Sequence, residues 1–263
     1  MSADLLAQRD PAYIAKVLPF LKLAMKGWFR SEVRDIDRVP EGGALMVGNH
    51  SGGLMAMDVP IIAVAFADTF GADRPLYCLA HDMLFTGAAG PLMRKFGFVP
   101  ADRASAGEVL ASGAVTIVFP GGDYDTFRPT LTANVIDFAG RKGYVRTALE
   151  AGVPIVPVVS IGGQEAQFHV TRGQFLGRLS PLRKVMRTDL LPLTIGFPFG
   201  LVPAGVGNLP LPTKIVTQVL DPIDITEEFG PEPDIAEVDE VVRARMQEAL
   251  DRLARERRFP VLG

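Results

Sequence analysis

Short apolar runs, each followed at once by a polar or glycine-rich motif, recur along the chain. The run Ala44–Gly48 leads directly into Asn49 and His50. Apolar runs of this length, rich in branched residues, are typical of buried strands. Similar runs lie at 76–80, 115–119 and 153–161, with helical patterns between them at 59–66 and 143–151. This alternation predicts an α/β fold with a mainly parallel sheet flanked by helices.

The N-terminal stretch has the pattern of an amphipathic basic helix. Its apolar positions repeat every three or four residues, at Ile14, Val17, Leu18, Leu21, Met25 and Trp28, with basic residues on another face at Lys22, Lys26 and Arg30. Pro19 lies inside the pattern and predicts a kink or a new helix start. Because Trp28 and Phe29 lie beside cations, we expect residues 1–30 to contact a membrane surface. The alternative is an ordinary helix packed on the domain with a solvated charged face.

The remainder, residues 31–263, is expected to form a single α/β domain. In its tail, 191–212 is rich in Pro and Gly, 214–219 is typical of an edge strand, and 237–258 of a charged amphipathic helix. No apolar run reaches the roughly 18–20 residues of a bilayer-spanning helix, and the start lacks the pattern of a secretory signal. We therefore expect a peripheral membrane protein on the cytoplasmic face.

Composition and charge narrow the classes of function. Hydrophobic residues make up 48% of the 263 residues, which is high and is consistent with a large core or a lipid-facing surface. The net charge of −3 argues against a nucleic-acid partner. The single cysteine, Cys78, excludes an intramolecular disulfide and a multi-cysteine zinc site, and fits a reducing compartment.

His50 is the strongest candidate for chemistry because it follows a predicted buried strand, where α/β sheets collect ligands. Gly52 and Gly53 come next and allow a tight turn that leaves room for a ligand. Asp58 follows His50 by eight positions and reaches the imidazole if the loop folds back. A carboxylate there fixes the tautomer and stabilises the imidazolium, as a general base requires. A purely structural role for the pair remains open at this point.

Four ordered blocks resemble the glycerolipid acyltransferase family of the lysophosphatidate type, over residues 28 to 225. The blocks are Gly48-Asn49-His50-Ser51, the segment 97–103, Phe119-Pro120-Gly121-Gly122 and the segment 153–158. The resemblance implies an acyl-CoA or acyl-carrier-protein donor, a glycerolipid acceptor, and base-assisted transfer within a ternary complex. It also implies no metal, no further cofactor and no covalent acyl-enzyme.

The chain departs from this family at two positions. The family usually has an Asp at the position of Met55, whereas the nearest carboxylate here is Asp58. It usually has a Glu at the position of Gly121. The Phe-Pro-Gly-Gly form and the segment 209–214 are more similar to diacylglycerol acyltransferases and phytyl-ester synthases. A neutral lipid or an alcohol is therefore the alternative to lysophosphatidate as acceptor.

Further residues of the blocks are candidates for substrate binding. Arg103 matches the arginine that the family uses for glycerol phosphate, and its alternative is a surface pair with Asp102 or another carboxylate. The backbone N–H groups of Gly121 and Gly122 are candidates to hold a phosphate or an oxyanion, unless the glycines only make a turn. Two more candidates lie where a substrate lip is expected, with structural roles as the alternative: Asp125 and Arg128.

Other classes of function have less support. The histidines are far apart and form no His-x-His or His-Glu-x-x-His motif, so a metal site is not expected. Ser51 beside His50 raises the possibility of a serine hydrolase, but no Gly-x-Ser-x-Gly motif is present. A non-catalytic lipid-binding module is the alternative of another class, because it would explain the apolar composition.

Overall fold

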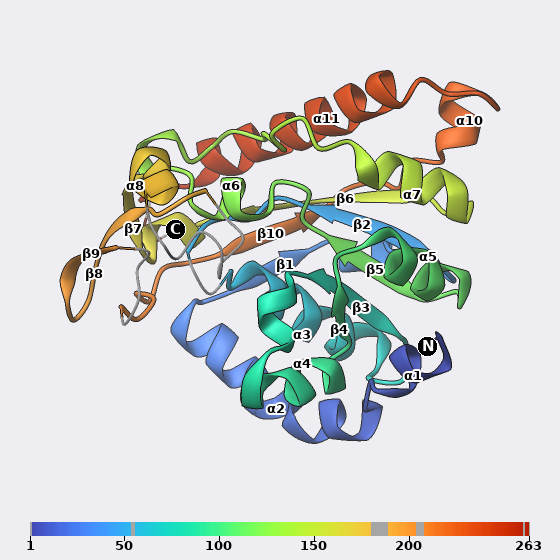
Figure 1. The fold of residues 1–263 in the computed structure, drawn as a ribbon, viewed down its shortest axis with the longest axis horizontal. Coiled ribbons are helices and arrows are strands. Elements are labelled where there is room, and N and C mark those ends of the chain that lie inside the picture. The colour runs from blue at the N-terminus through green and yellow to red at the C-terminus, as the bar shows by residue number, and fades with distance from the viewer. Residues whose placement is uncertain (1, 54–55, 180–188, 204–207, 260, 263) are drawn as a thin grey trace.

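The computed structural model describes residues 2–53, 56–179, 189–203, 208–259 and 261–262. Within these residues a seven-stranded sheet of order β1-β10-β6-β2-β5-β3-β4 forms the centre of the molecule (Figure 1). The strands from β6 to β4 are parallel, whereas β10 runs antiparallel to β6, and β1 is parallel to β10. The mainly parallel α/β fold is therefore confirmed. The strands are β1 (Glu32–Arg34), β2 (Ala44–Gly48), β3 (Leu76–Ala80), β4 (Phe98–Pro100), β5 (Val115–Val118), β6 (Ile155–Ile161) and β10 (Val216–Val219).

Helices cover both faces of this sheet (Figure 1). The α-helices are α1 (Ser2–Ala7), α2 (Pro11–Trp28), α3 (Asp58–Phe70), α4 (Gly90–Lys95), α5 (Arg103–Ala111), α6 (Gly122–Thr126), α7 (Gly143–Ala151), α8 (Gln174–Leu179), α10 (Ile225–Phe229) and α11 (Ile235–Glu256). Short 3-10 turns are η1 (Ile36–Arg38), η2 (Asp82–Phe85), η3 (Gly87–Ala89), η4 (Thr130–Thr132) and η5 (Gly163–Glu165).

Strand β2 lies in the middle of the sheet and is buried on both faces. Leu45 and Val47 point into a core that α7 and α11 complete, whereas Met46 points into a second core with residues of α3. Successive side chains of a strand alternate between faces, so a continuous apolar run is what a strand covered on both faces requires. Met46 aligns with Ile117 of β5 and with Val156 of β6. The end of β2 is thus fixed between two neighbours.

Helix α2 packs one face on α3 and exposes the other. Ile14 and Met25 are buried, and Phe29 is also buried at 3% exposure, so the expectation that Phe29 lies at a lipid interface is wrong. The helix continues without a new start across Pro19. Among the described residues, no helix combines the length and apolar character needed to cross a bilayer.

Two parts of the tail differ from expectation. Strand β10 lies between β1 and β6 and is not an edge strand, because the short strand β1 pairs with its outer side. The Pro- and Gly-rich region contributes to a separate antiparallel sheet of order β7-β8-β9 within the described residues. Its strands are β7 (Phe168–Thr171), β8 (Leu193–Gly196) and β9 (Gly200–Pro203).

Candidate active site

His50 and Asp58 meet at the carboxyl end of β2. His50 follows the strand, and the chain then turns through Gly52 and Gly53, whose φ angles of +104° and +89° favour glycine. Asp58 is the first residue of α3 and is fully buried. The Nδ1 atom of His50 lies 3.0 Å from Oδ2 of Asp58. Asp58 therefore reaches the imidazole across the eight positions that separate the two residues.

This contact determines which nitrogen of His50 is available. With Nδ1–H donating to Asp58, the neutral ring keeps a lone pair on Nε2, and Nε2 has no hydrogen-bond partner among the described residues. Burial disfavours the imidazolium, but the charge of Asp58, its hydrogen bond and the charge of Asp125 outweigh burial and raise the pKa of His50. His50 is thus arranged as a base with a strengthened affinity for protons.

The ring of His50 stacks on Phe119, with ring centroids 4.2 Å apart and an angle of 6° between the planes. Phe119 follows β5, the neighbour of β2. Gly48 makes room for this ring, since a Cβ atom there would lie 2.7 Å from it. Phe119 therefore fixes the plane of the imidazole. From the sequence, Phe119 is predicted only as part of a motif, with no signal for this role.

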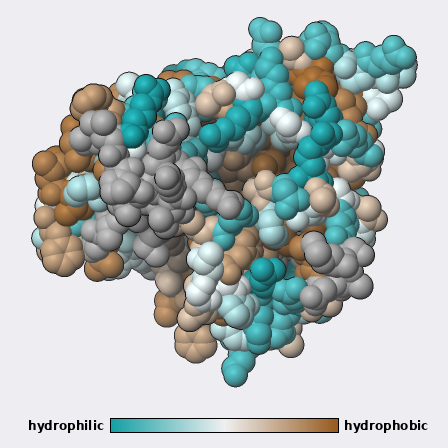
Figure 2. Space-filling view, viewed as in Figure 1, coloured by the Kyte–Doolittle hydropathy of each residue, from teal (hydrophilic) through white to brown (hydrophobic). Residues whose placement is uncertain are grey.

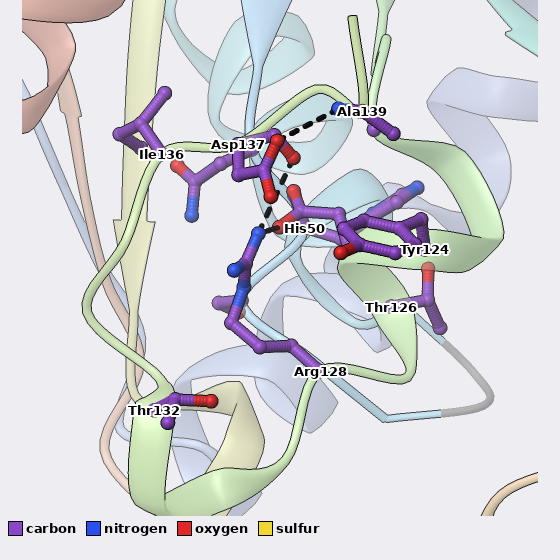
Figure 3. A network of polar contacts seen from close by, with 12 residues as sticks. His50, Tyr124, Thr126, Arg128, Thr132, Ile136, Asp137 and Ala139 are labelled. Carbon is purple, nitrogen blue, oxygen red and sulfur yellow. Dashed lines mark hydrogen bonds and ion pairs between the residues drawn. The ribbon is translucent and has the colours of Figure 1, made fainter. Parts of the chain in front are cut away.

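Asp125 and Arg128 form a buried pair behind His50. Oδ2 of Asp125 accepts the backbone N–H of His50 at 2.7 Å, and Oδ1 accepts from Nη2 of Arg128 at 2.9 Å. Figure 3 shows Arg128 pointing toward His50 and Asp137, whose carbonyl oxygen it also approaches. Burial raises the pKa of Asp125, although the Arg128 charge opposes the shift. The two residues are 1% and 3% exposed, so they position His50 instead of lining an open substrate lip.

The two glycines after Pro120 serve the turn into α6 in different ways. The N–H of Gly122 donates to the carbonyl oxygen of Phe119 at 3.0 Å, which leaves it engaged within the turn. A Cβ atom at Gly121 would collide with Asp125, so glycine there lets the carboxylate approach His50. No acceptor among the described residues pairs with the N–H of Gly121. Of the two, Gly121 is the remaining candidate for an oxyanion donor.

Arg103 lies apart from this cluster. It begins α5 after β4, the outermost strand on that side, and β3 and β5 separate β4 from β2. Its exposed guanidinium forms an ion pair with Glu150, while Asp102 caps α5 by accepting the N–H of Ser105. The structure thus joins Arg103 to another carboxylate, which was the alternative, and shows no hydrogen bond or ion pair between Arg103 and His50.

One polar residue near His50, Asn49, was not assigned a role from the sequence. The side-chain amide of Asn49 donates to the carbonyl oxygen of Ser160 and accepts its N–H, both at 2.9 Å, and so clamps the end of β2 to β6. The signal for this role that the sequence offers is the amide side chain of Asn49 directly before His50. Met55 lies outside the described residues.

The described residues contain no group of His, Cys, Asp and Glu side chains that could hold a metal ion. His169 is buried, contacts Thr194 at 3.0 Å, and has its pKa lowered to about 4 by burial. It is therefore a neutral residue of the small sheet. His81 caps η2, where its ring accepts the N–H of Met83.

Comparisons with known proteins identify the family and the fold. Residues 30–161 match the family model described as Acyltransferase. The uncharacterized protein Rv0502 of Mycobacterium tuberculosis is 34% identical over 261 residues, which span 97% of this chain and 70% of that protein. Diacylglycerol O-acyltransferase 2 of Dictyostelium discoideum is 31% identical over 152 residues, or 56% of this chain and 45% of that protein. Among solved structures, the 1-acyl-sn-glycerophosphate acyltransferase PlsC of Thermotoga maritima has a similar fold, with a TM-score of 0.58 and 19% identity over 92% of this chain and 79% of its own.

Proposed function

Because the chain belongs to the Acyltransferase family, we propose that it transfers a fatty acyl group from a thioester to a hydroxyl group of a glycerolipid. The donor is acyl-CoA or an acyl carrier protein. The contact of 3.0 Å between His50 Nδ1 and Asp58 Oδ2 is the observation that supports this most directly. A general base needs a carboxylate that orients the ring and a second nitrogen that is free to take a proton.

In the proposed reaction, Nε2 of His50 removes the proton of the acceptor hydroxyl as its oxygen attacks the thioester carbonyl carbon. The new C–O bond forms, and the negative charge moves to the carbonyl oxygen. Collapse of this intermediate breaks the C–S bond, and the departing thiolate takes the proton from His50. Asp58 stabilises the imidazolium between the two proton transfers. The N–H of Gly121 and the backbone at Gly52 are our candidates for stabilising the oxyanion.

We favour a neutral glycerolipid or an alcohol over lysophosphatidate as the acceptor. A cation strengthens the binding of a phosphate group, and Arg128 is buried in its pair with Asp125. Arg103 lies beyond two intervening strands and pairs with Glu150. The similarity to a diacylglycerol acyltransferase supports the same choice. Lysophosphatidate remains the second candidate, because the Arg103 pair is exposed and such pairs exchange at little cost.

We propose that the enzyme works as a peripheral protein on the cytoplasmic face of a membrane. Lys16 and Lys26 flank Phe20 and Leu23 on the exposed face of α2, which carries no acidic residue. Apolar side chains between cations are typical of a helix lying at the headgroup level. Because α2 also packs on α3, we expect it to act as part of the domain.

Product analysis with a His50 variant tests this function. Purified protein is incubated with acyl-CoA and, in turn, lysophosphatidate, monoacylglycerol, diacylglycerol and a long-chain alcohol, and the products are identified by mass spectrometry. His50→Ala should lower transfer by about 10²–10⁴-fold while lipid binding survives. A non-catalytic lipid-binding protein would form no product in either case.

Ser51→Ala is the matched control for the neighbouring nucleophile. It should keep most transfer, because Ser51 takes no part in the proposed steps. A hydrolase that used Ser51 would lose nearly all activity. Wild-type transfer by a folded His50→Ala protein would overturn the mechanism.

A further inference from the structure

The small sheet β7-β8-β9 is apolar on its outer face. Phe168 aligns with Ile195, and Ile195 aligns with Leu201, so one apolar row crosses the three strands. These three side chains are 38%, 47% and 61% exposed. In the next row His169 aligns with Thr194, and both are buried. An antiparallel sheet at a water surface has the reverse pattern, with apolar residues inside and polar residues outside.

The hairpin between β8 and β9 extends this apolar face. Phe197 and Phe199 are 63% and 66% exposed, and Leu209, which pairs with Phe197, is also exposed. The sequence has no Asp, Glu, Lys or Arg between Asp189 and Lys214. Sheet edges that meet water are normally protected by charged residues. In Figure 2 hydrophobic residues gather over this hairpin at the left edge of the molecule.

The apolar face is continuous with the exposed face of α2. The indole N–H of Trp28, at the end of α2, donates to the carbonyl oxygen of Pro210, beside Leu209 and Leu211. Further along α2, Phe20 and Leu23 are 74% and 72% exposed. Within the described residues, one surface therefore joins a helix that carries cations to three strands that carry no charged side chain.

The same sheet is tied to the turn that holds His50. The N–H of His169 donates to Oγ1 of Thr130 at 2.9 Å, and Nε of Arg172 donates to the carbonyl oxygen of Tyr124 at 3.1 Å. The Arg172 guanidinium also lies 3.7 Å from the centre of the Tyr124 ring. Tyr124 precedes Asp125, which accepts the backbone N–H of His50. These contacts connect the small sheet to the turn that holds Asp125 and, through Asp125, to His50.

We infer that the outer face of β7-β8-β9 docks onto a phospholipid bilayer, with Phe199 and Leu201 entering the acyl region and the cations of α2 meeting anionic headgroups. The choice of a bilayer as the partner rests on the proposed function, in which the acceptor comes from a bilayer. The uncharged apolar face matches the acyl region of a leaflet, and the adjoining lysines match its anionic headgroups. In this arrangement the sheet supplies apolar contacts with the acyl chains, and the lysines of α2 supply electrostatic attraction to the headgroups.

Vesicle flotation with the full chain tests the apolar share. Vesicles of phosphatidylcholine with phosphatidylglycerol are used at low and at high salt. Phe199→Ser with Leu201→Ser should reduce the partition coefficient about tenfold or more, and the loss should persist at high salt because apolar transfer is not screened. Val135→Ser is the matched control. Val135 is 44% exposed, and its segment is hydrogen-bonded to Gln247 of α11, on the opposite face of the main sheet from α2, so binding should not change.

Depth measurements give a direct readout. Trp28 is the only tryptophan, so Leu201→Trp in a Trp28→Phe background reports on β9 alone. Lipids with brominated acyl chains should quench this tryptophan and should leave a tryptophan at position 135 of the same background unquenched. Unchanged flotation of the double variant, or no quenching at position 201, would overturn the inference. Concentration-dependent dimers that the double variant abolishes, without any change in flotation, would assign the face to a second copy instead.

Failure of the proposed function has a different signature. If the wild-type protein forms no acyl product while flotation and quenching behave as stated, the function is wrong and the docking surface stands. Transfer to a water-soluble acceptor, present as monomers, should be unchanged in the Phe199→Ser, Leu201→Ser variant, because neither residue contacts the site.

Discussion

Asp58→Asn is the substitution that tests the assigned chemistry most sharply. The amide keeps the size of the carboxylate, and its oxygen can still accept from Nδ1 of His50, but it cannot stabilise an imidazolium. Asp58 is fully buried and its Oδ2 lies 3.0 Å from that nitrogen. A hydrogen bond to a charged group is worth about 1.5–3 kcal/mol, so kcat should fall about 10- to 150-fold. The loss should be smaller than that of His50→Ala.

The pH profile gives this substitution a signature that a simple packing defect lacks. A general base must be unprotonated, so kcat/KM should rise with pH through the pKa of His50. In the wild-type protein this limb should lie above the usual value of about 6.5, because Asp58 and Asp125 raise the pKa of His50 against burial. Without the Asp58 charge, burial remains, and the limb should move to lower pH while the plateau falls.

The assay is the initial rate of acyl transfer over a pH series, with folding checked by thermal unfolding. Asp68→Asn is the matched control, since Asp68 lies on the same helix but pairs with Lys22 at the surface. The control should change neither the plateau nor the limb. A lower plateau with an unmoved limb would refute the role of the Asp58 charge, and an unchanged rate would refute the pair altogether.

Two further predictions concern the arginines. Arg128→Met should lower the free energy of unfolding by about 3–5 kcal/mol, because it leaves Asp125 buried without its cation; the double variant with Asp125→Asn should recover most of the loss in chemical denaturation, and equal losses would contradict the buried pair. Arg103→Ala should leave both the transfer to diacylglycerol and the KM for lysophosphatidate nearly unchanged, because Arg103 lies beyond two strands from β2 and pairs with Glu150. A rise of about 10- to 150-fold in the KM for lysophosphatidate alone would show instead that Arg103 holds its phosphate.

The central strands and the position of His50 could be predicted because burial on both faces leaves a continuous apolar run. The runs predicted for β2 and β3 match the observed bounds, and the helix predicted at Gly143–Ala151 matches α7. Since parallel strands end at the same edge of a sheet, the motifs after β2 and β5 were expected to converge. His50 and Phe119 do so in a stacked pair.

The rest could not be predicted because short or reversed patterns carry no distinctive signal. Strand β1 has three residues, two of them charged, and exists because β10 offers it a partner. The strands β8 and β9 lie in a region whose Pro and Gly content favours loops. Asp125 and Arg128 have the spacing of an ordinary surface pair, and only the tertiary packing shows that they are buried.

The long spacing between His50 and Asp58 has a structural explanation. A carboxylate meets the imidazole when the following helix begins beside the ring, so the length of the loop matters less than where that helix starts. Here the chain turns at Gly52, where a Cβ atom would collide with Gln164, and α3 then begins with Asp58 itself. The dipole of a helix favours a negative charge in its first turn. The negative charge of Asp58 in turn stabilises the imidazolium of His50. The contact on which the proposed base depends is therefore present despite the longer spacing.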